Sequence, residues 1–439
     1  MAAPVPLELR TCERRSVVKR VMFYCQHVLG MGHLIRSAEI VRALSKDFKV
    51  LFVTGGEPSP NFGLAGNIKL LQLEPLKSDP EFANIHVCNP ALGLEETKVL
   101  RQEQLLRSFC SFRPDVLVTE LFPFGRKQFS FELIPLLEHA SSSPRTPLIV
   151  SSIRDVLVTK KDQAKHEQRV TDILNRFYDL VLVHGDERFL RLEDTFSRVG
   201  DLCCPVEYTG YVVQQEKQTA AKGHGRSRPT IVVSNGGGGC LSGHLLLESV
   251  LRAATLLQDT LPHAFHVFAG PLMPEGAYQR LEALVRLGGN VRLARYTSDL
   301  PAHLRRAQLS VSMAGYNTVM DILSTRVRAL VYPVTANGDQ EQSVRARKLE
   351  KMGVLKVLAG EQLEPVRLAL EILRALRSKP SQIILDLAGA ENSSLVIQKH
   401  LDAWSTHTLQ TQATFPVAER SWRASHRGGN QIEEGALCD

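Results

Sequence analysis

The sequence predicts an α/β protein built from two doubly wound parallel-sheet domains. In the first half, short apolar runs alternate five times with polar loops and helices, which is typical of a parallel sheet covered by helices. Residues 214–229 are rich in Gln, Lys, Gly, Ser and Arg and have no apolar periodicity, so we expect an interdomain linker there. The same alternation restarts at residue 230 and indicates a second domain.

These observations divide the 439 residues into segments with different expected roles. The expected segments are a disordered leader at 1–16, an N-terminal domain at 17–213, the linker at 214–229, a C-terminal domain at 230–404 and a polar, disordered tail at 405–439. The predicted strands are 17–25, 50–54, 67–73, 116–119, 148–152, 180–183, 230–234, 264–269, 290–293, 309–313 and 328–333. The predicted helices are 34–45, 95–112, 242–257, 275–287, 300–306, 316–323, 343–352, 363–376 and 395–403.

Composition narrows the class of protein. A hydrophobic fraction of 44% and a charged fraction of 23% are ordinary for a globular protein, and no apolar run approaches the ~20 residues of a membrane span. The first 20 residues lack the apolar core of a signal peptide, so a cytoplasmic location is expected. The net charge of +7 is locally dense at 10–20 and 222–228, which favours acidic ligands or peripheral contact with an anionic membrane.

Two classes of site are disfavoured by the residues present. The basic residues are not interleaved with aromatic ones, so nucleic acid is not an expected partner. The eight cysteines have no metal-ligand spacing with His, and no Asp-x-Asp occurs to hold a divalent cation. We therefore expect no metal site and no bound cofactor.

His33 is the first candidate catalytic residue. It follows a glycine-bearing loop after the first strand and precedes the helix at 34–45. The positive end of a helix dipole lowers the pKa of an imidazole and favours the neutral form, which suits a general base. The alternative is a histidine that merely caps a turn. The loop is not G-x-G-x-x-G, because no third glycine follows Gly32 at the required spacing, so a dinucleotide-binding motif is not supported.

Further polar residues follow the other strands of the N-terminal domain. Ligands of open α/β sheets collect at the carboxyl ends of the strands, and structural ion pairs also form there. The candidates delivered to this edge are Glu120 and Arg126 after the strand at 116–119, Arg154 and Asp155 after 148–152, and His184, Gly185 and Asp186 after 180–183.

The C-terminal half contains two anion-binding candidates. Four glycines at 236–239 follow the strand at 230–234 and allow close approach of the backbone to an anion. Gly315 lies between a strand and a helix, whose free N–H groups suit a phosphate. Asp321, about one turn further, is placed to accept hydrogen bonds from ribose hydroxyls, and the acidic and amide loop at 337–342 suits sugar hydroxyls. The alternative is ordinary parallel-sheet construction with a turn glycine and a capped helix.

With these segments in place, residues 20–400 resemble family 28 glycosyltransferases. This family includes the lipid-linked N-acetylglucosaminyltransferase of peptidoglycan synthesis, and a poorly characterised group of predicted bacterial glycosyltransferases is closer still. The segments GYNTVMD and DQEQSVRARKLEKMG follow the family pattern most closely. The resemblance implies the GT-B fold, in which two Rossmann-like domains face a cleft. It places the nucleotide sugar mainly on the C-terminal domain and the acceptor on the N-terminal domain.

The resemblance also implies residue roles. Asp321 stands where the family has a ribose-binding glutamate, and Glu341 and Gln342 match a Gln-Gln pair that contacts the donor sugar. The residues implied to face the diphosphate or the domain interface are Gly315, Tyr316, Asn317, Thr318, Gly237, Gly238, Gly32 and His33.

The expected function is therefore the metal-independent transfer of a hexosyl group from a nucleotide sugar to a hydroxyl acceptor. The resemblance implies a donor of the uridine diphosphate type, which the family favours. His33 is the first candidate for the base, with Glu120 or Asp155 second. The acceptor is a glycan, a lipid-linked molecule or a small molecule. Three alternatives remain. The segment GMGHLIRS resembles a loop of a UDP-sugar hydrolase, so hydrolysis is the first alternative. The others are a sugar-nucleotide 2-epimerase and an inactive nucleotide-sugar-binding protein.

Overall fold

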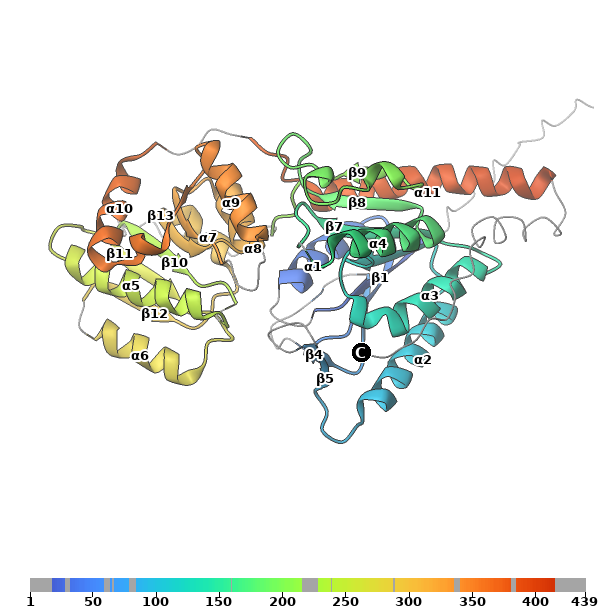
Figure 1. Ribbon diagram of the computed structural model, residues 1–439, viewed down its shortest axis with the longest axis horizontal. Helices are drawn as coiled ribbons and strands as arrows, with labels where there is room; N and C mark the ends of the chain where they lie inside the picture. The colour runs from blue at the N-terminus through green and yellow to red at the C-terminus, as the bar shows by residue number, and fades with distance from the viewer. Residues whose placement is uncertain are drawn as a thin grey trace, which may run out of the picture.

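The computed structural model contains two α/β domains, each with one fully parallel sheet and helices on both of its faces (Figure 1). This arrangement confirms the predicted fold class. The residues that the structure describes are 18–27, 32–58, 64, 67–78, 84–158, 160–214, 228–237, 239–286, 289–334, 340–379 and 384–414. The predicted leader, tail residues 415–439 and linker residues 215–227 lie outside these ranges.

The N-terminal sheet has the strand order β3-β2-β1-β6-β7-β8-β9. Its strands are β1 (Arg20–Cys25), β2 (Lys49–Thr54), β3 (Ile68–Gln72), β6 (Val116–Glu120), β7 (Leu148–Arg154), β8 (Leu180–His184) and β9 (Val206–Tyr208). The central strands are buried on both faces, which is why they are continuous apolar runs in the sequence. A short antiparallel pair, β4 (Leu76–Ser78) and β5 (Ile85–Val87), lies beside the sheet and was not predicted, because three residues are too few for a periodic signal.

Alternate residues of β1 pack into two different cores. Met22 and Tyr24 belong to the core beneath α2 (Leu94–Phe112), α3 (Ser130–Ser142) and α4 (Gln163–Phe177). Val21 and Phe23 point to the opposite face, which is covered by α1 (Gly32–Leu44). This division follows from the two-residue period of a strand.

The C-terminal sheet has the strand order β12-β11-β10-β13-β14-β15. Its strands are β10 (Thr230–Ser234), β11 (Ala264–Phe268), β12 (Val291–Ala294), β13 (Ala307–Met313), β14 (Ala329–Tyr332) and β15 (Lys356–Val357). One face is covered by α5 (Leu241–Leu257), α6 (Glu275–Val285) and α10 (Pro365–Arg377), and the other by α7 (Leu300–Arg306), α8 (Tyr316–Thr325) and α9 (Glu341–Lys351).

The last helix, α11 (Gly389–Thr414), returns to the N-terminal domain (Figure 1). Its residues Ala390, Ile397 and Leu401 are buried in the core that contains α1 and β1. Just before this helix, the backbone carbonyl of Asp386 accepts a hydrogen bond of 2.7 Å from the backbone N–H of Tyr211. The predicted assignment of 389–404 to the C-terminal domain therefore differs from the structure, because amphipathic periodicity indicates a buried face without indicating which sheet it covers. Among the described residues, no helix is long and apolar enough to cross a membrane.

Candidate active site

The centre of the site is a hydrogen-bonded pair formed by His33 and Glu120. His33 lies in the first turn of α1, and Glu120 is the last residue of β6. Nδ1–H of His33 donates to Oε1 of Glu120 over 2.6 Å, and the Arg36 guanidinium, one helical turn further along α1, donates to the same oxygen. The bond at Nδ1 fixes the tautomer, so Nε2 carries the lone pair.

Burial sets the charges of this pair. It lowers the pKa of His33 to about 3, with the help of the Arg154 cation and against the opposing effect of Glu120. Burial by itself would raise the pKa of Glu120, but His33, Arg36 and Arg126 outweigh it and lower that pKa below its usual value. Near neutral pH the histidine is therefore neutral and the carboxylate is ionised, which is the state that a general base requires.

Asp155 belongs to a buried ion pair between the domains. It follows β7, and Arg345 on α9 donates to it twice, from Nε over 3.0 Å and from Nη2 over 2.6 Å. The hydroxyl of Tyr211 donates to the same carboxylate over 3.1 Å. These contacts use three of the about four acceptor sites of the Asp155 carboxylate. The geometry therefore gives it a role in domain contact rather than in proton transfer.

A second ion pair between the domains connects Arg154 with Glu341. Nη1 of Arg154 lies 3.0 Å from both carboxylate oxygens, and Nη2 of Arg345 lies 2.9 Å from Oε1. Burial would raise the pKa of Glu341, but Arg154 and Arg345 lower it to about 2. The carboxylate that the resemblance assigns to the donor sugar is thus bound by two arginines.

The first turn of α8 meets the N-terminal domain at the same place. The amide of Asn317 donates to the Gly32 carbonyl over 3.4 Å, and the hydroxyl of Tyr316 donates to the His184 carbonyl over 3.3 Å. The Tyr316 ring has guanidinium carbons of Arg36, Arg154 and Arg345 at 5.3, 5.5 and 4.9 Å from its centroid. The N-termini of α1 and α8 and these three cations therefore surround one small region.

The helix α8 also carries the candidate ribose ligand. Gly315 precedes its first turn, and a side chain there would meet no atom of the described residues within 4 Å. Asp321 is only 2% exposed, and its Oδ1 has no hydrogen-bond partner among the described residues. Burial, together with Asp299 and Glu39, raises the pKa of Asp321 to about 8. A buried carboxyl with an unused oxygen is costly unless a ligand completes its hydrogen bonds.

Other predicted site residues have different surroundings. Gln342 accepts a hydrogen bond of 3.1 Å from the backbone of Val334. Gly237 accepts one of 2.9 Å from the backbone of Leu272, while Gly238 lies outside the described residues. Thr318 is buried in α8.

The residues after β8 have structural partners. His184 is held between Ser152 at 2.7 Å and Thr209 at 2.8 Å. Asp186 pairs with Arg188. Gly185 packs closely on Asp155, because a Cβ added to Gly185 would lie only 2.8 Å from the Cβ of Asp155.

Three residues of the site were not predicted from the sequence as ligands or partners: Arg36, Tyr211 and Arg345. For two of them the sequence contained a signal, namely helical spacing from a predicted site residue. Arg36 is one turn after His33, and Arg345 is four residues after Glu341, so each shares a helix face with a predicted residue. Tyr211 had none, because its contact depends on how the two domains meet.

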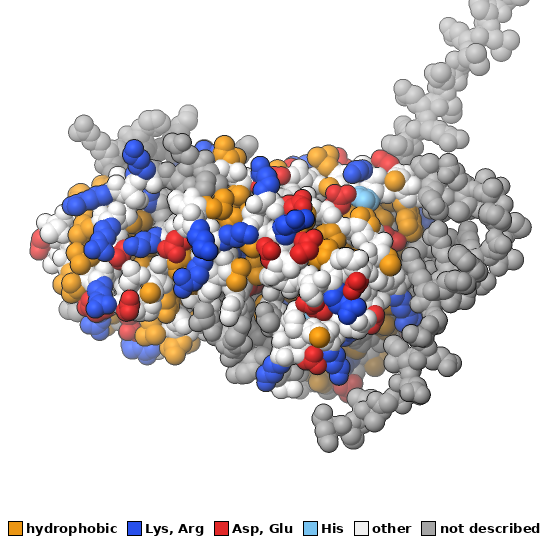
Figure 2. All heavy atoms as spheres, turned by 45° about the horizontal axis from the view of Figure 1, so that its top comes forward, with side chains coloured by type: hydrophobic (Ala, Val, Ile, Leu, Met, Phe, Trp, Pro, Cys, Tyr) orange, Lys and Arg blue, Asp and Glu red, His pale blue; other side chains and the backbone are white. Residues whose placement is uncertain are grey.

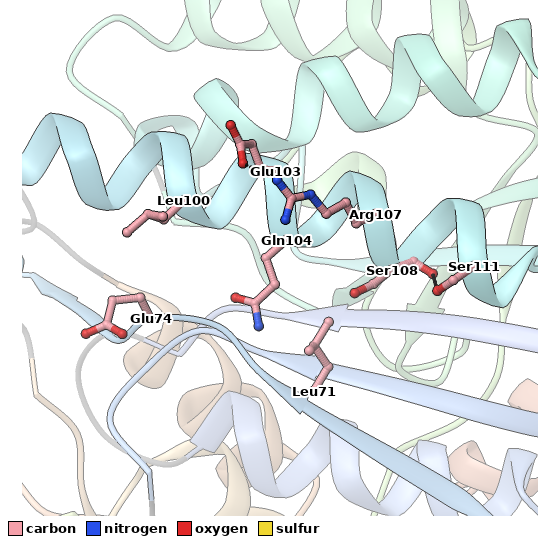
Figure 3. Close-up of a pocket in the computed structure, with 8 residues that line it drawn as sticks. All are labelled: Leu71, Glu74, Leu100, Glu103, Gln104, Arg107, Ser108 and Ser111. Carbon is pink, nitrogen blue, oxygen red and sulfur yellow. Dashed lines mark hydrogen bonds and ion pairs between the residues drawn. The ribbon is translucent and has the colours of Figure 1, made fainter.

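One small and one larger cavity bear on the position of the site. A small one of about 10 Å³ adjoins Arg36, Asn317 and Asp321 and is too small for a nucleotide sugar, so a ligand of that size requires the domains to separate. A larger one of about 530 Å³ lies between α2 and β3, where Leu71 and Gln104 point into it (Figure 3). Its lining includes no residue of the charged region around His33 and Tyr316.

The architecture is shared with known proteins. The solved structure of CalG4, the calicheamicin glycosyltransferase, superposes with a TM-score of 0.55 at 15% identity, covering 90% of this chain and 98% of that one. The MurG structure from Acinetobacter baumannii gives a TM-score of 0.51 at 15% identity, covering 87% and 99%. These likenesses establish the fold. The chain is a two-domain α/β protein of the GT-B class.

The C-terminal domain has a more specific relationship. Residues 238–400 match the glycosyltransferase family 28 C-terminal domain. Over 171 residues the chain is 31% identical to the UDP-N-acetylglucosamine--N-acetylmuramyl-(pentapeptide) pyrophosphoryl-undecaprenol N-acetylglucosamine transferase of Hahella chejuensis (strain KCTC 2396), covering 38% of this chain and 45% of that protein. The enzyme of the same name from Rhodopseudomonas palustris (strain BisA53) is 30% identical over 156 residues, which are 33% and 41% of the two chains. The chain thus spans less than half the length of these curated relatives.

Proposed function

We propose that this protein transfers a glycosyl group from a nucleotide sugar, of the uridine diphosphate type, to a hydroxyl group of an acceptor. The observation that carries the proposal is the 2.6 Å bond between His33 and Glu120, which lies where the N-terminus of α1 faces the N-terminus of α8. The family of the C-terminal domain supports the same reaction class.

His33 is the base in this mechanism. Its Nε2 takes the proton of the acceptor hydroxyl while the oxygen forms a bond to the anomeric carbon, and Glu120 stabilises the resulting imidazolium. The bond from that carbon to the diphosphate breaks, and its electron pair leaves with the diphosphate. Glu120, held by His33 and Arg36, acts as a positioning residue.

The low pKa of His33, about 3, depends partly on repulsion from Arg154. A diphosphate bound at the N-terminus of α8 lies beside that arginine and offsets its charge, so donor binding raises the pKa of the base. His33 is therefore a stronger base when the donor is bound, so it takes up the acceptor proton when transfer can occur.

The leaving diphosphate is stabilised by the protein itself. The backbone N–H groups of the first turn of α8, at Tyr316, Asn317 and Thr318, point towards the space beyond Gly315. These groups need no metal or other cofactor to hold the charge that develops as the bond breaks. Gly237, in the glycine loop after β10, adds backbone of the same kind.

Asp321 binds the ribose hydroxyls in this proposal. Asp321, whose Oδ1 has no partner among the described residues, lines the small cavity beside Arg36 and Asn317, and a diol supplies the hydrogen bonds that the buried carboxyl lacks. Glu341 and Gln342, at the start of α9, contact the donor sugar when the domains have opened and closed around it.

The acceptor is proposed to be lipid-linked and reached from a membrane surface. The relatives from Hahella chejuensis and Rhodopseudomonas palustris are transferases whose names specify an undecaprenol-linked acceptor. On the face drawn in Figure 2, Lys and Arg side chains gather over the C-terminal domain at the left. Exposed residues of α10 combine such charges with apolar side chains, namely Val366, Arg367, Leu370, Arg374 and Arg377, which is a composition that suits peripheral contact with anionic lipid.

The test is release of UDP from a panel of UDP-sugars, with and without a lipid extract, for the wild type and Asp321→Ala. Release that depends on the extract and is lost in the variant supports transfer. Release at the same rate without extract identifies a hydrolase, and binding without release identifies a nucleotide-sugar-binding protein.

A further inference from the structure

The three arginines around Tyr316 have more N–H groups than the described residues can satisfy. Arg36 and Arg345 are fully buried, and Arg154 is 15% exposed. In the part of the chain that the structure describes, no acceptor is within reach of Nε and Nη1 of Arg36, Nε of Arg154 or Nη1 of Arg345. Buried N–H groups of a cation are costly to leave unpaired, and several that converge on one ring indicate a place for an anion.

The balance of charged side chains around Tyr316 also indicates a place for an anion. The cations of the region are the buried Arg36 and Arg345 and the partly buried Arg154, joined by Arg126, which acts electrostatically on both His33 and Glu120. The carboxylates that contact them are Glu120, Asp155 and Glu341. Four cations therefore face three anions, because His33 is neutral. A buried excess of positive charge is stabilised by one additional anionic group.

Glu341 differs from the other two carboxylates in how it is attached. Glu120 ends a central strand and Asp155 is bound by both Arg345 and Tyr211, so each has a fixed place. Glu341 is the first residue of α9, and it reaches Arg154 across the domain boundary. Its contact with Arg154 is therefore lost when the domains separate, whereas its contact with Arg345, on the same helix, is not.

We propose that Arg36, Arg154 and Arg345 form a binding site for a phosphoryl group of the substrate, and that Glu341 occupies Arg154 and Arg345 until that group binds. The planar guanidinium groups of Arg154 and Arg345 then exchange a carboxylate for phosphoryl oxygens, which they bind with the same fork geometry. The released Glu341 faces the sugar hydroxyls. The site stands on its own contacts; only the source of the phosphoryl group rests on the proposed function.

The proposal predicts that removing a negative charge improves binding in one variant and that removing a positive charge weakens it in another. Glu341→Gln no longer competes for Arg154 and Arg345, so inorganic pyrophosphate should bind roughly 3- to 10-fold more tightly. Arg154→Gln should bind pyrophosphate at least about tenfold more weakly, and Arg154→Lys should fall between this variant and the wild type. Glu282→Gln, on the exposed face of α6, makes the same charge change elsewhere in the C-terminal domain and should have no effect.

The experiment is isothermal titration of pyrophosphate into the full chain at fixed ionic strength, with circular dichroism and thermal unfolding to establish that each variant is folded. Pyrophosphate needs no nucleotide or sugar, so a failed glycosyl transfer assay does not affect the result. Unchanged or weaker binding in Glu341→Gln would overturn the proposal, as would unchanged binding in the folded Arg154→Lys variant.

A competition arm separates the two sources of the phosphoryl group. If UDP displaces pyrophosphate and uridine does not, the site takes the diphosphate of the donor. If pyrophosphate still binds to the UDP-saturated protein, and Glu341→Gln still strengthens that binding, the site takes a phosphoryl group of the acceptor.

Discussion

Nδ1 of His33 lies 2.6 Å from Oε1 of Glu120, and this bond joins the start of α1 to the end of β6. Glu120 raises the pKa of His33, although burial and Arg154 dominate and lower it. Glu120→Gln should therefore lower the pKa of the base further, move the acidic limb of the kcat profile to lower pH and reduce kcat by at least about tenfold.

The measurement is a pH–rate profile of Glu120→Gln beside the conservative variant Glu120→Asp, which keeps the charge and should restore part of the rate. A purely structural role for Glu120 would reduce the amount of folded enzyme and leave the position of the acidic limb unchanged.

The second prediction concerns the ion pair between Asp155 and Arg345. Both side chains are fully buried, so removing one leaves the other as an unpaired charge. Arg345→Met should lower the free energy of unfolding by about 3–5 kcal/mol. The double variant Asp155→Asn, Arg345→Met should lose much less than the sum of the single losses. Urea unfolding of the four proteins measures this, and strictly additive losses would contradict a direct interaction.

The third prediction concerns Asp321 and pH. Its pKa is raised from 3.8 to about 8 in the folded protein, so the folded state holds a proton that the unfolded state has lost between these values. The contribution of Asp321 to the free energy of unfolding should therefore fall as pH rises, by about 1.4 kcal/mol per pH unit from about pH 4 to about pH 8. Asp321→Asn removes this dependence and should be relatively more stable at pH 7.5 than at pH 5.

Chemical denaturation at the two pH values is the measurement for Asp321. Asp172→Asn on α4 is the matched control, because this exposed carboxylate accepts a hydrogen bond from Gln168 that an amide can also accept. An Asp321→Asn variant with the same pH slope as the wild type would contradict the burial argument.

The fourth prediction uses two helical glycines. A Cβ on Gly243 of α5 would lie 1.6 Å from Oδ1 of Asn235, whereas a Cβ on Gly276 of α6 would meet no described atom within 4 Å. Gly243→Ala should destabilise the protein by about 1–3 kcal/mol because buried Asn235 must move. Gly276→Ala should stabilise it by about 0.5–1 kcal/mol through helix propensity. Calorimetric Tm values test both, and equal shifts would be inconsistent with close packing at Gly243.

Much of the fold could be predicted because the strands are apolar and the loops are not. The apolar runs that end at Cys25 and at Met313 are both central strands, and the ends of these strands lie within three residues of the predicted ones. The place of α11 could not be predicted, since its apolar stripe fits either sheet. Its packing against α1 is set by tertiary structure, which local periodicity does not encode.

The site was only partly predictable for a related reason. The rule that ligands gather at the carboxyl ends of strands placed Glu120, Arg154 and Asp155 together, and the structure brings them to one region. That Asp155 pairs with Arg345, and Arg154 with Glu341, depends on contacts between residues 187 and 190 positions apart. A single sequence carries no signal for pairing at that separation.

The most direct test of the central claim is the rate of acceptor-dependent UDP release by the wild type and His33→Ala, with titration of UDP to measure donor binding. The rate should be about 100- to 10,000-fold lower in the variant with UDP affinity retained, because His33 acts on the acceptor proton. An unchanged rate in His33→Ala, with UDP bound as before, would show that the proton leaves by another route and would contradict the assignment of the base.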